Sequence, residues 1–173
     1  MWPRAEPIET ERLTLEPVRS GHASEMVRVL AAPALYVHTG GEPPTQDDLE
    51  RRYEVQSAGH SRDGTQGWLN WVARSRTGRA AGYVQATLTG AEHAMLADVA
   101  WVIGVEHQGN GIATEAAGAM MAWLAQHGVV DVRAFIAPDN LGSNAVARKL
   151  GLVPTDVVVD AEVCWSPRAR GPG

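Results

Sequence analysis

The chain has 173 residues, a length typical of one domain, which buries roughly 70% of the surface that it exposes when unfolded. Hydrophobic residues make up 45% and charged residues 20%, as in soluble globular proteins. The net charge of −5 argues against a nucleic-acid partner and favours a cationic partner molecule. A single cysteine, Cys164, excludes a disulfide within the chain and is expected to pack as a small hydrophobe.

Targeting, membrane and metal signals are not found. The N-terminus has no apolar run after its first charges, and no stretch approaches the ~20 apolar residues needed to span a bilayer. We therefore expect a cytoplasmic protein with no membrane partner. The six histidines are scattered without ligand spacing, so we expect no metal site. Residues 1–7 and 167–173 are predicted to be loose tails of a single domain, residues 1–173.

The first third of the chain predicts one strand and two helices. Residues 12–17 alternate between apolar and polar side chains, which indicates a strand. A short helix is predicted for residues 20–30, and a glycine- and proline-rich loop follows at residues 40–44. Residues 45–48, Thr-Gln-Asp-Asp, resemble a capping box, so a second helix is predicted over residues 46–58.

The remaining chain predicts six strands and two helices. The predicted strands are residues 68–75, 81–89, 94–103, 132–137, 152–159 and 161–166. The helices are residues 111–127 and 140–150, and glycine follows each of them. The order is then β-α-α-β-β-β-α-β-α-β-β. An antiparallel meander followed by a βαβ unit predicts a mixed α/β sheet with helices on both faces.

A glycine-rich loop joins the strand that ends at Ile103 to the helix that begins at Gly111. Free N–H groups and the helix dipole make such a helix start attractive to anions. Gly109 and Gly111 let a phosphate touch the backbone, and Ala113 is small enough to keep the approach open. Three or four hydrogen bonds of about 1.5–3 kcal/mol each can hold a pyrophosphate without a lysine. The only lysine of the chain is Lys149.

Two other interpretations of this loop stay open. One is a tight strand-to-helix connection without a ligand. The other is a dinucleotide-binding fingerprint, which Gly109-x-Gly111-x-x-Thr114 nearly matches, although threonine stands where glycine or alanine is usual. The chain lacks the second βαβαβ half that a dinucleotide-binding fold requires.

Three motifs in order resemble the GNAT superfamily of N-acetyltransferases. Residues 108–113 read QGNGIA and match the Q/R-x-x-G-x-G/A motif, and the following TEA is similar to members that acetylate ribosomal-protein alanine. Residues 140–152, NLGSNAVARKLGL, resemble a second family motif, and residues 9–15, ETERLTL, resemble a first strand. The resemblance spans residues 8–166. It implies a GNAT-like acyl-CoA N-acyltransferase fold and an acetyl-CoA-dependent N-acetyltransferase.

The resemblance also implies roles for single residues. The backbone at Ile103 would pair with pantetheine, Asn140 would contact the cofactor arm, and Ser143 would lie near the sulfur. As alternatives, Asn140 only caps its helix and Ser143 is a solvated first-turn serine. Glu115 is expected to complement the helix N-terminus. The residues expected to bind the CoA pyrophosphate are Gln108, Gly109, Asn110, Gly111, Ala113 and Thr114.

The expected reaction is direct attack of a primary amine on the thioester, without a covalent intermediate. Many relatives carry a tyrosine acid where this chain has Ala147, and an arginine where it has Glu16. Asp98 is the only base candidate, with a solvated strand residue as its alternative. Tyr36 and Trp71 are expected to wall the acceptor pocket.

The amine must be neutral, which costs about 4 kcal/mol for a lysine and about 0.5 for an α-amine. An α-amine is therefore the better acceptor, but the candidates include a protein N-terminus, an amino acid, a polyamine and an antibiotic amine. A homodimer stays open. A catalytically inactive acetyl-CoA-binding module is the rival function.

Overall fold

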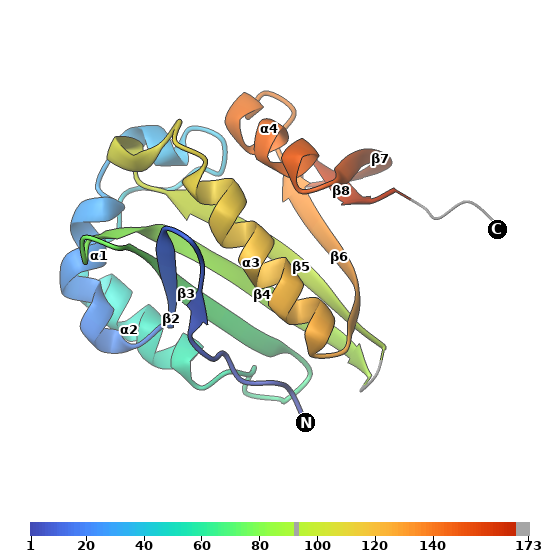
Figure 1. Ribbon diagram of the computed structural model, residues 1–173, viewed down its shortest axis with the longest axis horizontal. Coiled ribbons are helices and arrows are strands. Elements are labelled where there is room, and N and C mark those ends of the chain that lie inside the picture. Colours follow the sequence, from blue (N-terminus) through green and yellow to red (C-terminus); the bar gives the residue numbers. More distant parts are fainter. Residues whose placement is uncertain (92–93, 169–173) are drawn as a thin grey trace.

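Eight strands form one sheet in the computed structural model, which describes residues 1–91 and 94–168. The order across the sheet is β1-β2-β3-β4-β5-β6-β8-β7 (Figure 1). Neighbouring strands are antiparallel, except that β5 and β6 are parallel. The strands are β1 (Ile8–Glu9), β2 (Leu13–Pro17), β3 (Gly67–Ser75), β4 (Ala80–Ala91), β5 (Ala94–Ile103), β6 (Val129–Ile136), β7 (Leu152–Val159) and β8 (Glu162–Pro167).

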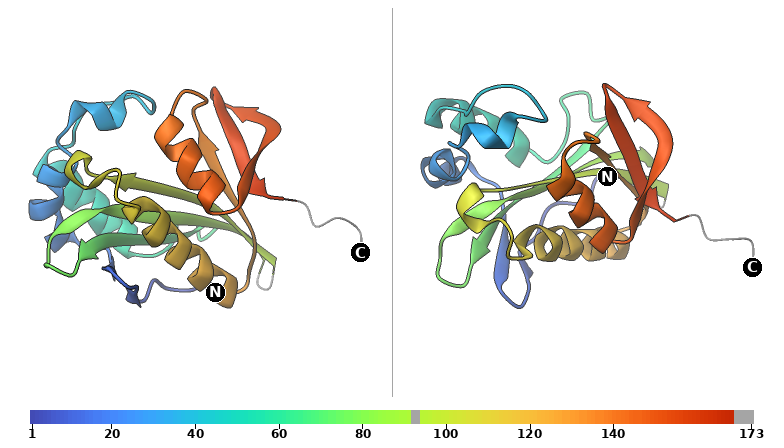
Figure 2. Two further views of the ribbon diagram at one scale, coloured as in Figure 1. Left: turned by 45° about the horizontal axis from the view of Figure 1, so that its top comes forward. Right: turned by 90° about the horizontal axis from the view of Figure 1, so that it is seen from above.

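Helices cover both faces of the sheet, as predicted. Helices α1 (Ala23–Val29) and α2 (Gln46–Ser57) contact each other on one face, and α3 (Ile112–Gln126) crosses the other face (Figure 2). Helix α4 (Leu141–Lys149) packs beside α3, against β6 and β7. Three short 3-10 segments lie in the connections: η1 (Ser20–His22), η2 (Pro33–Tyr36) and η3 (Val105–His107).

Most predicted elements are confirmed, and the differences have local causes. The capping box begins α2 as expected, because Thr45 Oγ1 accepts a hydrogen bond from the Asp48 amide and Asp48 accepts one from the Thr45 amide. Strand β6 begins at Val129 instead of residue 132, since its pairing with β5 starts there. The two-residue strand β1 and the 3-10 segments were not predicted, because segments so short show no periodicity.

Strand alternation divides the apolar side chains into two cores. Leu69, Trp71 and Ala73 of β3 point to the α3 face, whereas Val72 points to α1 and α2. The larger core is completed by α3 residues such as Met120, and the smaller one lies under α1 and α2. Each layer of helices is therefore fixed to the sheet by its own apolar contacts.

The prediction of a loose tail at residues 1–7 is corrected by the structure. The Trp2 indole packs on the larger core, lies over Gly67, and donates a hydrogen bond of 3.0 Å to the Gly64 carbonyl oxygen. The Trp71 indole donates one of 2.8 Å to the Glu6 carbonyl oxygen. A large aromatic side chain near a chain end thus ties that end down. At the other end, Pro167 completes β8, and residues 169–173 lie outside the described residues.

A charged network joins β2, α1 and β3 behind the smaller core. Arg74 contacts Glu16 at 3.1 Å and Glu25 at 2.9 Å, and Glu16 also lies 3.0 Å from the buried imidazole of His22. Glu25 accepts a hydrogen bond from the Ala80 amide. The family resemblance would place an arginine at the position of Glu16. In this chain the carboxylate at that position is paired with the positive charge of Arg74.

These contacts shift three pKa values. Burial raises the pKa of Glu16 and Glu25, but their hydrogen bonds and the Arg74 charge outweigh it, so both pKa values lie below the usual 4.5. Burial lowers the pKa of His22 below 6.5 and outweighs the nearby Glu16 carboxylate. All three groups bind protons less readily when folded, so acid must destabilise the fold.

The free energy of unfolding should therefore fall below pH 6.5 as His22 is protonated in the unfolded chain, and more steeply below pH 4.5 as the carboxylates are protonated. Urea denaturation at pH 7, 5.5 and 4 measures this. Glu16→Gln should cost about 1–2 kcal/mol at pH 7 and flatten the dependence below pH 4.5. An unchanged acid slope in this variant would contradict the role given to Glu16.

Candidate active site

The two parallel strands in the centre of the sheet, β5 and β6, separate halfway along their length. Their pairing runs from Met95↔Val129 to Asp98↔Arg133 and ends there. Strand β5 continues to Ile103 beside β4, while β6 continues beside β8 (Figure 1). From residue 99 to 103 the edge of β5 that faces β6 therefore has no strand partner, and we call this separation of the two strands the opening. The backbone edge of such a strand can pair with an extended ligand as an added strand would.

Two helices begin at this opening. Parallel strands have their carboxyl ends at the same edge of a sheet, so the loop before α3 and the loop before α4 both border the opening. From the other side, the segment after η2 reaches it, because His38 Nδ1 lies 3.2 Å from Asp139 Oδ1 in the loop before α4. Segments from three parts of the chain thus surround one site.

The loop before α3 is shaped by two glycines in the left-handed region. Gly109 and Gly111 have φ angles of 78° and 77°, which L side chains rarely adopt. The Gln108 side-chain amide fixes the loop to the strand by donating to the Ile103 carbonyl oxygen at 2.9 Å. Gly111 is the N-cap of α3 and offers no side-chain cap, whereas Thr45 caps α2 and Asn140 caps α4. The first amides of the longest helix are thus left for an anion.

A charged brace holds the loop against the start of the chain. Arg12 donates from Nη1 to the Asn110 carbonyl oxygen at 2.8 Å and from Nε to Glu115 at 2.6 Å. Glu115 also accepts from Thr10 Oγ1 at 2.7 Å and from the Arg12 amide at 2.8 Å. Burial raises the pKa of Glu115, but these bonds outweigh it and leave the pKa below 4.5. Glu115 was expected only to complement the helix, and no local pattern indicates a partner 103 residues away.

The start of α4 places two of the predicted residues. Asn140 Oδ1 accepts a hydrogen bond of 3.1 Å from the Ser143 amide, so the capping role of Asn140 is confirmed. The Ser143 side chain is half-buried, and its hydroxyl forms no hydrogen bond with the described residues. Asn144 supports the turn by donating to the Pro138 carbonyl oxygen. Ala147 is fully buried one turn further on, where relatives carry tyrosine.

Asp98 lies at the point where the strands part, and its carboxylate is already engaged. Arg133 contacts it with Nε at 2.8 Å and Nη2 at 2.7 Å. Its register partner is Thr87, and cross-strand partners lie on the same face of a sheet, so Asp98 points to the α2 side. To accept a proton from a substrate, it would first have to give up part of this ion pair.

The two residues predicted to wall an acceptor pocket lie close to a cavity under α2. The Tyr36 hydroxyl donates a hydrogen bond of 2.8 Å to the carbonyl oxygen of Leu30, which lines a small part of this cavity. Trp71 borders the same part, but its indole is fully buried on the opposite face of the sheet and packs edge-on against Trp123. The role of either residue toward an acceptor stays a prediction.

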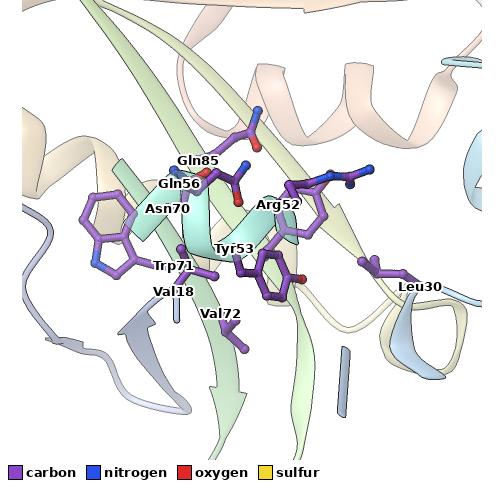
Figure 3. Close-up of a pocket in the computed structure, with 10 residues that line it drawn as sticks. Val18, Leu30, Arg52, Tyr53, Gln56, Asn70, Trp71, Val72 and Gln85 are labelled. Atoms are coloured by element: carbon purple, nitrogen blue, oxygen red, sulfur yellow. The ribbon is translucent and has the colours of Figure 1, made fainter. Parts of the chain in front are cut away.

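A cavity of about 480 Å³ lies between α2 and strands β3 and β4, and a small enclosed pocket extends it toward η1 and α1 (Figure 3). Its volume lies within the usual range for small-molecule sites. Gln85, which lines both parts, pairs across the ladder with Ala100 on β5, directly after the point of parting. The cavity therefore adjoins the opening from the α2 face. Sequence periodicity gave no sign of it. Residues that line both parts are Arg52, Gln56, Asn70 and Gln85.

The structure also bears on metal binding and on membrane insertion. Within residues 1–91 and 94–168, no three His, Cys, Asp or Glu side chains gather as metal ligands would. In the same part of the chain, no helix is long and apolar enough to cross a membrane.

Comparison with known proteins identifies the family. The model of the acetyltransferase (GNAT) domain matches residues 12–153, so the chain belongs to the GNAT acetyltransferases, which use acetyl-CoA. A protein that binds acetyl-CoA needs a place for an extended cofactor and its phosphates. The opening and the uncapped start of α3 are consistent with that need. No curated protein sequence matches the chain.

Solved structures share the fold at low sequence identity. RimL, a ribosomal L7/L12 α-N-protein acetyltransferase in complex with CoA, is similar with a TM-score of 0.71 and 15% identity over 93% of this chain and 97% of its own. AAC(6')-Ib in complex with ribostamycin and CoA has a TM-score of 0.74 and 18% identity, covering 94% and 100%. A GNAT-family protein from Bordetella pertussis has a TM-score of 0.69 and 23% sequence identity, over 94% of this chain and 99% of its own.

Replacing Gly111 tests the loop. Gly111→Val adds a branched side chain at a φ of 77° and beside the open amides, so it should abolish the rise in Tm that acetyl-CoA gives the parent protein. Gly78→Val is the matched control, because Gly78 has a φ of 85° in the β3–β4 hairpin with open space around it. A differential scanning measurement should show the control responding like the parent. An equal response in both variants would show that the loop does not bind the cofactor.

Proposed function

We propose that this protein transfers the acetyl group of acetyl-CoA to a primary α-amine, by direct attack within a ternary complex. The observation that supports this best is the opening between β5 and β6, bordered by the uncapped start of α3. The opening offers an extended strand edge for a ligand chain and a cluster of amides for its phosphates, as acetyl-CoA requires.

The cofactor would be held by backbone more than by side chains. The pyrophosphate would lie on the amides of residues 109–114, and the pantetheine arm would follow residues 99–103 of β5. Asn140 and Ser143 would then border the thioester end from α4. Asn140 serves as a helix cap in any case, so its contribution to binding would come from the same amide group that orients the helix.

The chemistry follows from this placement. The neutral amine attacks the thioester carbonyl, a C–N bond forms, the C–S bond breaks, and CoA leaves as thiolate, while the proton lost by the attacking nitrogen passes to water or to the thiolate. Backbone N–H groups near the opening would stabilise the oxyanion, and the two held reactants gain from proximity. Because Asp98 is engaged by Arg133, the site favours an amine that loses its proton cheaply, and an α-amine does so at about 0.5 kcal/mol.

Release of free CoA with a panel of amines tests the proposal. The panel contains dipeptides, free amino acids, spermidine and ribostamycin, each with acetyl-CoA at pH 7.4. Amines with a low pKa, above all the dipeptides, should give turnover above hydrolysis. If acetyl-CoA raises the Tm but no amine gives turnover, the inactive acetyl-CoA-binding module is the better description.

Ser143→Ala addresses the leaving group. The Ser143 hydroxyl is free of hydrogen bonds to the described residues, and Ala147 offers no acid, so Ser143 would donate to the sulfur directly or through water. A thiolate is a fair leaving group at neutral pH, and the help should be about 1–2 kcal/mol, a five- to thirtyfold lower kcat in the variant. The calorimetric Kd for acetyl-CoA should hardly change. An unchanged kcat would leave Ser143 as a residue of the helix start.

A further inference from the structure

The cavity under α2 is lined by amides and guanidinium groups. Gln56, Asn70 and Gln85 gather on one side of it, with Arg52 nearby (Figure 3). Of the described residues that line either part, none is an aspartate or a glutamate. The cavity thus has the opposite character to the chain as a whole, whose net charge of −5 favoured a cationic acceptor. A polycationic amine would find no counter-charge here.

Arg52 is an arginine without an acidic partner. Its neighbour Arg51 also borders the cavity and contacts Asp48 at 2.7 Å. Arg52, by contrast, forms no ion pair with any residue in the described part of the chain, and it lines both parts of the cavity. A guanidinium presents a fork of donors that matches a carboxylate. Arg52 is exposed where it lines the cavity, so an anionic group can reach this fork from solvent.

The Tyr53 hydroxyl is a second, independent observation, at the small pocket that extends the cavity. The residue is 5% exposed, and its buried hydroxyl forms no hydrogen bond with the described residues. An unpaired buried hydroxyl destabilises a protein, so such a group calls for a partner. Burial raises the pKa of Tyr53 far above its usual value, and the hydroxyl remains a donor at neutral pH. The hydroxyl and the Arg52 guanidinium point to the same side in Figure 3.

We propose that the acceptor is a small primary amine that also carries a carboxylate, with Arg52 and Tyr53 binding the carboxylate. The proposal rests on the proposed function, because it names the substrate class of the same site. The amine would point past Gln85 toward Ala100 on β5, one strand spacing of about 4.8 Å across the sheet.

Matched acceptors test the carboxylate. The first pair is an alanyl-alanine dipeptide with a free carboxyl end and the same dipeptide amidated, and the second is alanine and alaninamide. Within each pair the amines are of the same type, so a difference in kcat/KM reports the carboxylate. The member with the extra carboxylate should be favoured about tenfold. The pair with the larger ratio tells whether a peptide end or a free amino acid is the source.

Arg52→Gln should remove this preference by raising KM about tenfold for the carboxylate member, with kcat within twofold. Arg51→Gln is the control on the same helix and should keep the preference, because Arg51 is already paired with Asp48. Tyr53→Phe should leave the Tm unchanged or raise it, since it deletes an unpartnered hydroxyl, yet raise KM about fivefold. A tyrosine with only a packing role would leave KM unchanged.

Calorimetry of the dipeptide with CoA-loaded protein separates this inference from the proposed function. Arg52-dependent binding without turnover would support the cavity assignment and contradict the transferase proposal. Turnover that is equal for acid and amide, that prefers spermidine, or that Arg52→Gln leaves unchanged would overturn the cavity assignment and leave the transferase proposal standing.

Discussion

The parting of β5 and β6 is the constraint on which the rest of the structure depends. Every buried backbone group needs a hydrogen-bond partner, and beyond Arg133 the facing edges of β5 and β6 no longer supply one to each other, because β8 pairs with the opposite edge of β6. The edge of β5 from residue 99 onward is then available to a ligand in the middle of a sheet. A site formed in this way depends little on particular side chains, because the backbone of β5 supplies the hydrogen-bonding groups.

The helices that follow the two strands complete the site in different ways. Helix α4 satisfies its own N-terminus through Asn140, whereas α3 has no side-chain cap and begins at a glycine with a φ of 77°. The loop is held in place by Arg12, which joins the Asn110 carbonyl oxygen to Glu115. The turn between β1 and β2 is thereby connected to the candidate cofactor loop, and the contact uses a carbonyl oxygen of the loop instead of its amides.

The sequence predicted what depends on local pattern. Periodicity located β5 and α3, the capping motif located the start of α2, and the glycines of the loop indicated a phosphate site. Long-range contacts were not predictable in this way. Trp2 near the chain end, the Arg12–Glu115 pair and the pairing of β6 with β8 all join segments far apart in the chain. Trp71 shows the same limit, since an aromatic residue on a strand has two possible faces and only the assembled sheet selects one.

A crystal structure of the protein with CoA would test the central claim most directly. We expect pantetheine to lie between β5 and β6 and to pair with the backbone of residues 99–103, with the pyrophosphate on the amides of residues 109–114. The thiol would end near Ser143, on the side of the cavity under α2. A cofactor bound outside the opening, or phosphates held away from the start of α3, would contradict it.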